Sequence, residues 1–295
     1  CWMKQEWDTV PEMESRLSYD RLVAEIIRLN PAKKRFSSSG VTAMQVFQRI
    51  AAVLILPVLL LAGYFLIRDQ SEMARYSEII VPKGQKSELM LPDSTHIWLN
   101  SGSRLRYPVR FLGKRREVYL SGEAYFEVEK DQNRPFVVHA ASLAVHVLGT
   151  KFNVRAYPDD QDMETALLEG KVKLMLDHSQ EQDAGIELSP GDLLLYSGKT
   201  GIVKKEGFVP DEVVGWKNNR LIFRDDTFDK LVAKIERWYN VRISYDRRLF
   251  QNKRLTVELA EGESLERLFE IIGKAISVEY EIDKQEIKIR PKMKH

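Results

Sequence analysis

Cysteine is almost missing from this chain of 295 residues, in which Cys1 is the single example. A lone cysteine excludes an intrachain disulfide and a zinc site built from cysteines. The chain also lacks an excess of one charge, since 45 Lys and Arg residues face 43 Asp and Glu residues. This balance gives no whole-molecule argument for binding nucleic acid or an acidic substrate. The length allows two modest domains or one large domain, and because Cys1 rather than Met comes first we expect a fragment of a longer protein.

One long hydrophobic run stands out in a chain whose charged fraction is 30%. Residues 50–67, "IAAVLILPVLLLAGYFLI", carry no charge, and Val46 and Phe47 extend the apolar segment. A buried core helix normally shows a polar stripe, which this run lacks. A secretory signal is usually shorter and nearer the N-terminus, and it ends at an A-x-A site, which is also lacking here. The run therefore predicts a single transmembrane helix over residues 46–67, kinked at Pro57.

The charges on either side of this run predict its orientation. Residues 28–49 hold five cations and no acid, whereas residues 68–88 hold four of each. Positively charged flanks stay in the cytoplasm. We therefore expect a cytoplasmic stub (1–36), a basic flexible linker (37–45), the transmembrane helix (46–67), a second linker (68–80) and folded modules on the outside. A small inner piece and a large outer piece suggest a signalling protein.

Residues 81–205 predict an outer all-β domain of many short antiparallel strands, built like a sandwich or a solenoid. Apolar residues alternate in "LAVHVLG", "KFNVRAY" and "GKVKLML". Turn signals recur at short intervals, among them Pro92-Asp93, Ser121-Gly122 and Pro190-Gly191. No stretch in this range has the pattern of a long amphipathic helix.

After a predicted linker (206–217), residues 218–292 contain a repeat. "LIFRDDTFDKLVAKIERWYNVRISYD" and "LTVELAEGESLERLFEIIGKAISVEYEID" each read as strand, helix, strand, and "QEIKIR" adds a last strand. The apolar stripes of the two helices are offset by 37 residues. The order β-α-β-β-α-β-β predicts a small α+β module. Asp226 is the expected N-cap of the first helix, and Glu263 and Ser264 bring an acid and a hydroxyl to the start of the second.

Four stretches in the β-rich part, which together contain five motifs, carry a family resemblance. "LPDSTHIWLNSGSRLRYP", "REVYLSGEAYFEVEKDQNRPFVVH", "VHVLGTKFNVRAY" and "LLEGKVKL" follow one another along the chain. They resemble the FecR family of transmembrane anti-sigma regulators, whose usual pattern is LPDG-x-x-V-x-LN-x-x-S, GEA-x-F-x-V, PF-x-V, V-x-VLGT-x-F-x-V and EG-x-V. Ser94 stands where the family usually has glycine.

The second half of the chain has its own resemblance. "WKNNRLIFRDDTFDKLVAKIERWYNV" is similar to the C-terminal module of FecR-like proteins and, more widely, to the secretin and TonB short N-terminal domain. We expect the matched family positions to be structural, because they combine turn glycines with apolar residues on strands. These positions are Asn100, Gly122, Glu123, Phe126, Pro135, Gly149, Thr150, Phe152, Gly170, Trp216 and Phe223.

The resemblance implies a regulator and not an enzyme, with no cofactor and no metal. The cytoplasmic part would bind an extracytoplasmic-function sigma factor, and the outer modules would sense the signalling domain of a TonB-dependent outer-membrane receptor. The chain would be a single-pass protein of the bacterial inner membrane with its C-terminal modules in the periplasm, regulating transcription of nutrient-uptake genes. The stub is shorter than the family's sigma-binding domain and corresponds at most to its tail.

Two other functions remain open from the residues themselves. Glu123 and Glu127 share a strand face, as the paired carboxylates of a membrane-tethered glycan hydrolase would, although surface or turn-capping acids are the simpler interpretation. A structural envelope tether would need no chemistry at all.

Two further clusters have simple interpretations. His139 and His146 lack a third metal ligand at suitable spacing, so we expect satisfied strand histidines. Residues 104–116 hold six cations and no acid. We expect a solvated hairpin there, with a contact to anionic lipid or to an acidic partner as the alternative. The predicted topology argues against nucleic acid as the partner of this segment.

Overall fold

The computed structural model describes residues 21, 23–25, 47–48, 50, 54–64, 75–176, 185–198, 201–259 and 262–292. The chain divides into two compact units, Cys1–Arg68 and Asp69–His295. The predicted stub 1–36 lies almost entirely outside the described residues, and the linker 37–45 lies wholly outside them.

In the first unit, residues 54–64 are helical, and their large apolar side chains are exposed. Within the described ranges, no helix combines the length and the apolar character that a membrane crossing needs. The predicted transmembrane helix over 46–67 extends beyond those ranges at both ends, so it stays a prediction.

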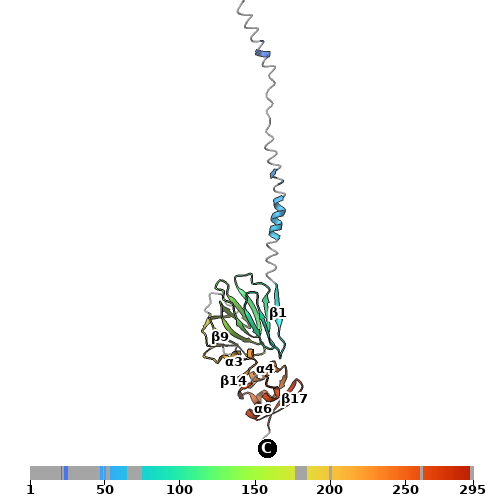
Figure 1. Cartoon of the computed structure of the whole chain (residues 1–295), viewed down its shortest axis with the longest axis vertical. Helices are drawn as coiled ribbons and strands as arrows, with labels where there is room; N and C mark the ends of the chain where they lie inside the picture. The colour runs from blue at the N-terminus through green and yellow to red at the C-terminus, as the bar shows by residue number, and fades with distance from the viewer. Residues whose placement is uncertain are drawn as a thin grey trace, which may run out of the picture. The chain divides into compact units, whose positions relative to one another are not determined.

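The second unit begins with a β-rich domain in which thirteen strands form one curled sheet (Figure 1). The strands are β1 (Tyr76–Ile80), β2 (Ser87–Met90), β3 (His96–Leu99), β4 (Arg104–Pro108), β5 (Arg116–Glu127), β6 (Phe136–Ala140), β7 (Leu143–Val147), β8 (Lys151–Ala156), β9 (Asp162–Glu169), β10 (Val172–Leu176), β11 (Ile186–Leu188), β12 (Asp192–Ser197) and β13 (Gly201–Glu206). Most pairs are antiparallel, as the alternation predicts, but β5 and β6 pair in parallel. The alternating segments quoted above form β7, β8 and β10.

Strand β5 belongs to both halves of this sheet. Its first part pairs with β4 and β6, and its second part pairs with β3 and β8. The strand exchanges one set of partners for the other at Ser121 and Gly122, and Gly122 has a φ of 118°. A Cβ on Gly122 would lie 2.5 Å from Ser103 Oγ, so the crossing needs glycine. The core of the domain draws on both halves, and Phe126 stacks on Phe152 with ring centroids 5.0 Å apart.

The basic segment 104–116 is only partly a solvated hairpin. Arg116 is 1% exposed, and its Nη1 lies 2.7 Å from Asp93 Oδ2. Its Nε also donates to the carbonyl of Arg134 at 3.0 Å. The expectation that all six cations are solvated is therefore wrong for Arg116, because this guanidinium ties the β2–β3 turn to the start of β5. Removing one partner of such a buried pair costs about 3–5 kcal/mol.

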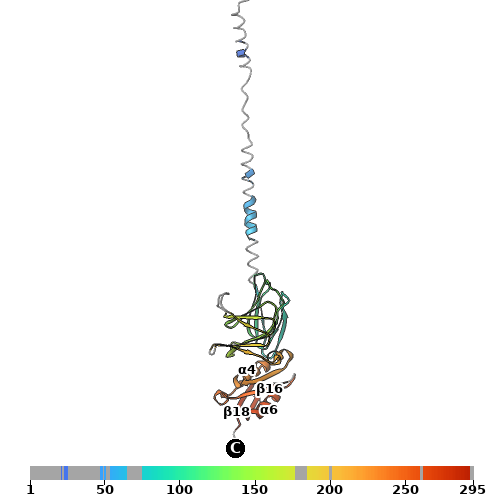
Figure 2. The ribbon, with the colours of Figure 1, turned by 90° about the vertical axis from the view of Figure 1, so that its left-hand side faces the viewer.

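The C-terminal module follows α3 (Pro210–Val214) and the 3₁₀ helix η1 (Gly215–Asn218), which lie within the predicted linker 206–217 except for Asn218. It comprises β14 (Leu221–Thr227), α4 (Phe228–Tyr239), β15 (Arg242–Ser244), α5 (Arg247–Phe250), β16 (Arg254–Leu259), α6 (Leu265–Ile276), β17 (Val278–Asp283) and β18 (Glu286–Pro291) (Figure 2). This is the predicted order with the short helix α5 added. Strand β14 pairs with β16, and β18 lies between β15 and β17.

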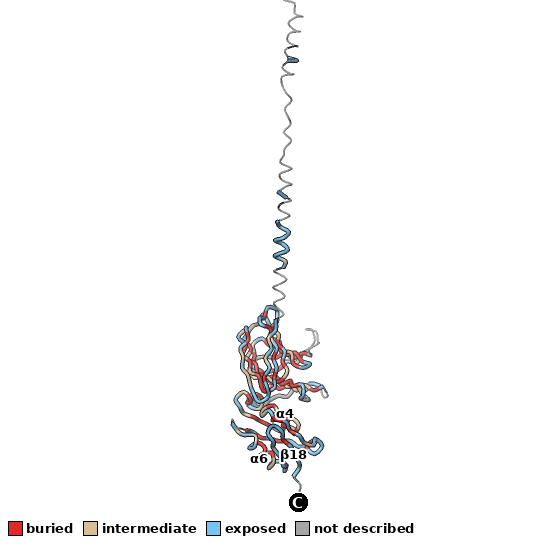
Figure 3. Tube along the Cα trace, turned by 90° about the vertical axis from the view of Figure 1, so that its right-hand side faces the viewer, coloured by how far each residue is buried: buried red, intermediate tan, exposed pale blue. Residues whose placement is uncertain are grey.

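Helices α4 and α6 each have 12 residues and begin 37 residues apart, as the repeat predicts. They bury matched apolar residues, such as Leu231 and Leu268, in the second core (Figure 3). Ser264 caps α6 as expected. The predicted Asp226 cap of α4 is wrong: Thr227 accepts the hydrogen bond from Lys230 N, while Asp226 binds Lys234 at 2.7 Å. Asp is generally a stronger N-cap than Thr, so the sequence favoured Asp226 and the predicted helix start was one position too early.

Candidate functional site: the contact between the two modules

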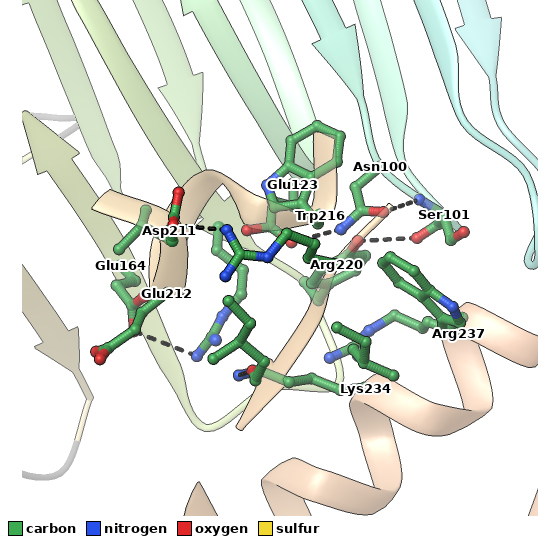
Figure 4. Close-up of a pocket in the computed structure, with 16 residues that line it drawn as sticks. Asn100, Ser101, Glu123, Glu164, Asp211, Glu212, Trp216, Arg220, Lys234 and Arg237 are labelled. Atoms are coloured by element: carbon green, nitrogen blue, oxygen red, sulfur yellow. Dashed lines mark hydrogen bonds and ion pairs between the residues drawn. The ribbon is translucent and has the colours of Figure 1, made fainter. Parts of the chain in front are cut away.

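A cluster of polar and charged side chains lies where the β-rich domain meets the C-terminal module (Figure 4). The β-rich domain contributes residues of β5, β8 and β9 and the turns that follow β3 and β8. The C-terminal module contributes one face of α4 and the start of β14, and α3 and η1, which lead into the module, lie on the same side of the contact. Trp216, in η1, is 7% exposed and lies at the centre of this contact.

Glu123 organises the β-domain side of the contact. Its Oε2 accepts a hydrogen bond from Asn100 Nδ2 at 2.8 Å, and its Oε1 accepts one from Asn153 Nδ2 at 3.0 Å. A carboxylate is an acceptor only, so it turns the amide group of Asn153 toward itself and leaves Asn153 Oδ1 pointing away. That oxygen accepts a hydrogen bond from Trp216 Nε1 at 3.3 Å. Glu123 thereby fixes the acceptor that receives the indole of the other module.

Burial raises the pKa of Glu123, and the Arg155 guanidinium and the two asparagine amides partly oppose that rise. Burial by itself lowers the pKa of Arg155, but the carboxylates of Glu164, Asp160 and Glu123 outweigh it and raise that pKa. Arg155 is 7% exposed and lies 3.4 Å from both Asp160 and Glu164. The cluster therefore holds its charges in compensating pairs, as a buried contact requires.

Arg237 of α4 reaches into the same cluster from the C-terminal module. Its Nη2 lies 3.0 Å from Asp160 Oδ1, and its Nη1 lies 3.3 Å from Asp159 Oδ2. The guanidinium carbon is 3.9 Å from the centroid of the Tyr157 ring, and the backbone carbonyl of Arg237 accepts from Gly84 N at 2.8 Å. Arg237 therefore binds two turns of the β-rich domain at once.

Two lysines cross the contact in opposite directions. Lys86 of the β-rich domain lies 3.9 Å from the centroid of a Trp238 ring, and its Nζ donates to Trp216 O at 2.6 Å. Lys217 of η1 lies 3.7 Å from a Trp98 ring centroid and 4.3 Å from that of Tyr125. We call Lys86 and Lys217 with these rings the reciprocal lysine clamp. Because both lysines are only partly buried, each cation–π contact contributes on the order of 0.5–1 kcal/mol.

The cluster lines a partly open pocket of about 70 Å³, which is room for a few water molecules. Among the residues that the structure describes, no group of three or more His, Cys, Asp or Glu side chains is placed to hold a metal ion. The chemistry that the cluster offers is charge pairing and hydrogen bonding between two modules.

Glu123, Glu127 and His139, which were singled out from the sequence, have partners of their own. Glu123 is not the surface acid that was expected, because it is bonded within the contact, and Glu127 lies 3.7 Å from Lys217 Nζ. His139 stacks on Tyr119 with centroids 4.8 Å apart and lies 3.7 Å from Glu117. His146 is partly buried on β7.

The family-motif positions divide into two groups. Asn100, Glu123 and Trp216 meet at the contact, whereas the others hold the framework. Thr150 Oγ1 donates to Lys171 O at 3.0 Å, beside Gly149 and Gly170, and Pro135 O accepts from Arg116 N at 2.8 Å. Phe126, Phe152 and Phe223 are fully buried.

Sequence reasoning missed Asn153, Lys86, Arg237 and Trp238, although all four belong to the contact. Asn153 occupies an unspecified place in its motif. The other three read as ordinary helix or turn residues. Their partners are 70 or more residues away in sequence, so no local pattern could have found them.

The comparisons agree with this two-module architecture. The family described as "FecR protein" matches residues 77–173, and the family described as "FecR, C-terminal" matches residues 220–289. Two crystal structures of a "putative anti-sigma factor" from Parabacteroides distasonis, at 1.65 and 2.50 Å resolution, are similar to this chain. They share 29% identity with it, cover 74% of it and 100% of their own chains, and superpose with TM-scores of 0.67 and 0.68. No curated protein matches. The two matched segments span more than half of the residues, and the chain belongs to the FecR family.

Proposed function

We propose that this chain is an anti-sigma regulator that carries a signal across the bacterial inner membrane. Its C-terminal module would receive the signalling domain of a TonB-dependent outer-membrane receptor, and its N-terminal side would control an extracytoplasmic-function sigma factor. The observation that carries the proposal is the presence of both FecR segments, in order, on one chain. The similar crystal structures bear the name of an anti-sigma factor.

The geometry of the module contact supports this role. A signal that arrives at the C-terminal module can pass on only if that module is mechanically joined to the β-rich domain. Arg237, Trp216 and the reciprocal lysine clamp supply such a joint through charge-assisted and cation–π contacts. A force or displacement at α4 would therefore act on β3, β5 and β8.

The apolar run supports the membrane part of the proposal. Leu54, Leu59 and Leu60 of the described helical stretch are each more than 60% exposed. Side chains of this kind need an apolar environment, and a lipid bilayer provides one. We propose a single crossing with the N-terminus in the cytoplasm, following the charges on either side of the run.

A transcription reporter tests the proposal. Deleting residues 218–292 should change sigma-dependent reporter expression, and deleting the whole gene should change it further or abolish regulation. The full chain in detergent should also retain the receptor's signalling domain in a pull-down, and the version lacking 218–292 should not. Unchanged reporter expression in both deletions would refute the regulator and would favour the structural tether.

The glycan-hydrolase alternative has its own test. It requires that Glu123→Gln abolish a glycan-cleaving activity of the purified chain while leaving reporter regulation intact. The regulator instead requires that any effect of Glu123→Gln appear in the reporter, because Glu123 orients Asn153 toward Trp216.

A further inference from the structure

The loop between β4 and β5 presents apolar and basic side chains together. We call residues 109–115 the basic loop. Val109 and Leu112 are both 49% exposed, and the cations Arg110, Lys114 and Arg115 belong to the same loop. Exposed aliphatic side chains flanked by cations suit the boundary between lipid headgroups and acyl chains.

The basic loop is held in this shape by the domain beneath it. Phe111 lies between the two exposed residues but is only 9% exposed, with its ring 6.1 Å from that of Phe136. Its carbonyl accepts a hydrogen bond from Arg134 Nη1 at 3.3 Å. Because Phe111 is anchored in the core, Val109 and Leu112 remain outside it.

The charges of the basic loop are largely uncompensated. In the described ranges, the side chains of Arg110 and Lys114 form no ion pair, and neither does the side chain of Arg75 beside them. Arg115 lies 3.9 Å from Glu117, and Arg116 is buried against Asp93. At least three cations therefore face outward next to two exposed apolar side chains, which is complementary to an anionic surface.

The position of the basic loop next to the predicted transmembrane helix indicates which anionic surface the loop meets. Val109 N donates to Arg75 O at 2.9 Å, so the loop lies where the chain enters β1. Only eight Cα–Cα steps separate Arg75 from residue 67, where the predicted transmembrane helix ends, and eight extended residues reach at most about 30 Å. At the other end of β1 and β4, Val81 and Ser103 adjoin the turns that contact the C-terminal module.

We propose that the basic loop docks on the anionic headgroups of the membrane that the chain crosses, with Val109 and Leu112 entering the interface. The docked loop would orient the β-rich domain so that the end of β1 and β4 next to the loop faces the bilayer. The C-terminal module, at the opposite end, would then point away from the bilayer. This inference rests on the proposed membrane crossing and adds a second membrane contact to it.

Lipid-borne quenching of a fluorophore tests the docking. The full chain carrying Cys1→Ser and Leu112→Cys is labelled and inserted into vesicles of either zwitterionic or mixed zwitterionic and anionic lipid, each containing nitroxide-labelled lipid. The matched control replaces Leu112→Cys by Leu249→Cys, because Leu249 is 54% exposed on α5 of the C-terminal module. We expect quenching at position 112 in anionic vesicles, weaker quenching in zwitterionic ones, and none at position 249.

A charge variant tests the electrostatic part. Arg110→Gln with Lys114→Gln should lower the ratio of docked to undocked loops roughly fivefold for each lost charge. Arg248→Gln with Lys253→Gln, two exposed cations of the C-terminal module, should leave that ratio unchanged.

Three results would overturn the inference in distinguishable ways. If the chain floats with the vesicles but position 112 is not quenched, the crossing stands and the docking fails, which leaves an acidic protein as the partner of the basic loop. If positions 112 and 249 are quenched equally, the docking surface is wrong. If the chain does not float with the vesicles, the proposed crossing fails as well.

Discussion

At the scale of single residues, Gly122 has little freedom to change. Its φ of 118° is strained for any other residue, and a Cβ there would lie 2.6 Å from Ser103 Cα. The family pattern G-E-A includes this glycine, but the sequence does not say why. The reason is the crossing of β5 between the two halves of the sheet.

Gly122→Ala should lower the free energy of unfolding by about 3 kcal/mol or more, since backbone strain and overpacking each cost on the order of 1–3 kcal/mol. Urea denaturation followed by circular dichroism measures the change. Gly113→Ala is the control, because its Cβ would meet nothing closer than 3.7 Å. Equal denaturation midpoints for the two variants would contradict the role assigned to Gly122.

His146 makes stability depend on pH. Burial, helped by Arg115, His139 and Lys173, lowers the pKa of His146 to about 4. Between pH 6.5 and 4 the unfolded chain therefore binds a proton on this imidazole that the folded chain does not bind. Stability must fall as pH falls through this window.

Between pH 6.5 and 4, His146 should lower the free energy of unfolding by an amount on the order of 1 kcal/mol, a value discounted for the partial exposure of the imidazole. His146→Gln should flatten the dependence of the unfolding free energy on pH between 6.5 and 4. Urea titrations at several pH values measure it, and a slope identical to that of the unaltered chain would rule out His146 as its source.

At the scale of elements, the strands and helices follow closely from local sequence. Alternation predicts β7, β8 and β10, and the offset of 37 predicts that α4 and α6 are equivalent. The local pattern gives the wrong prediction where contacts with distant residues determine the structure. Residues 206–217 read as a linker, yet Val213 and Trp216 are buried there, because the β-rich domain supplies partners that are remote in sequence.

Helix capping gives an element-scale prediction. Thr227→Ala and Ser264→Ala should each destabilise the C-terminal module by about 1 kcal/mol, because each side chain accepts from a backbone N–H in the first turn of its helix. Thermal melting measures both changes. Asp246→Ala, which removes the cap of the four-residue helix α5, should have a smaller effect. An unchanged melting temperature for Thr227→Ala would contradict the assignment of Thr227 as the N-cap of α4.

At the scale of the whole molecule, the contact between the modules determines whether they act as one body. Interfaces within a chain commonly allow relative motion when they are small and polar. Here the polar groups are paired, since Glu123 orients Asn153 toward Trp216 and Arg237 binds Asp159 and Asp160. The reciprocal lysine clamp adds two contacts at separate points of the same interface.

Lys86→Gln with Lys217→Gln should uncouple the modules. The unaltered second unit should unfold in one calorimetric transition, and the double variant should unfold in two, with faster proteolysis between residues 206 and 220. Lys171→Gln with Lys253→Gln, at two exposed lysines outside the contact, should keep the single transition. A single transition in the clamp variant would show that the lysines are dispensable for coupling.

The sequence by itself determined the period of each segment, and hence an all-β domain followed by an α+β repeat. It also determined the apolar run and the charges beside it, from which an orientation is predicted, because these properties depend on residues close together in the chain. The tertiary structure decided which motif residues meet. Glu123 is bonded to Asn153 and Arg116 is buried against Asp93. Trp216 lies at the centre of the module contact, where its carbonyl accepts a hydrogen bond from Lys86. These partners come close only when the chain folds. Local pattern carries no information about such distant pairings, and the joint between the two modules consists of them.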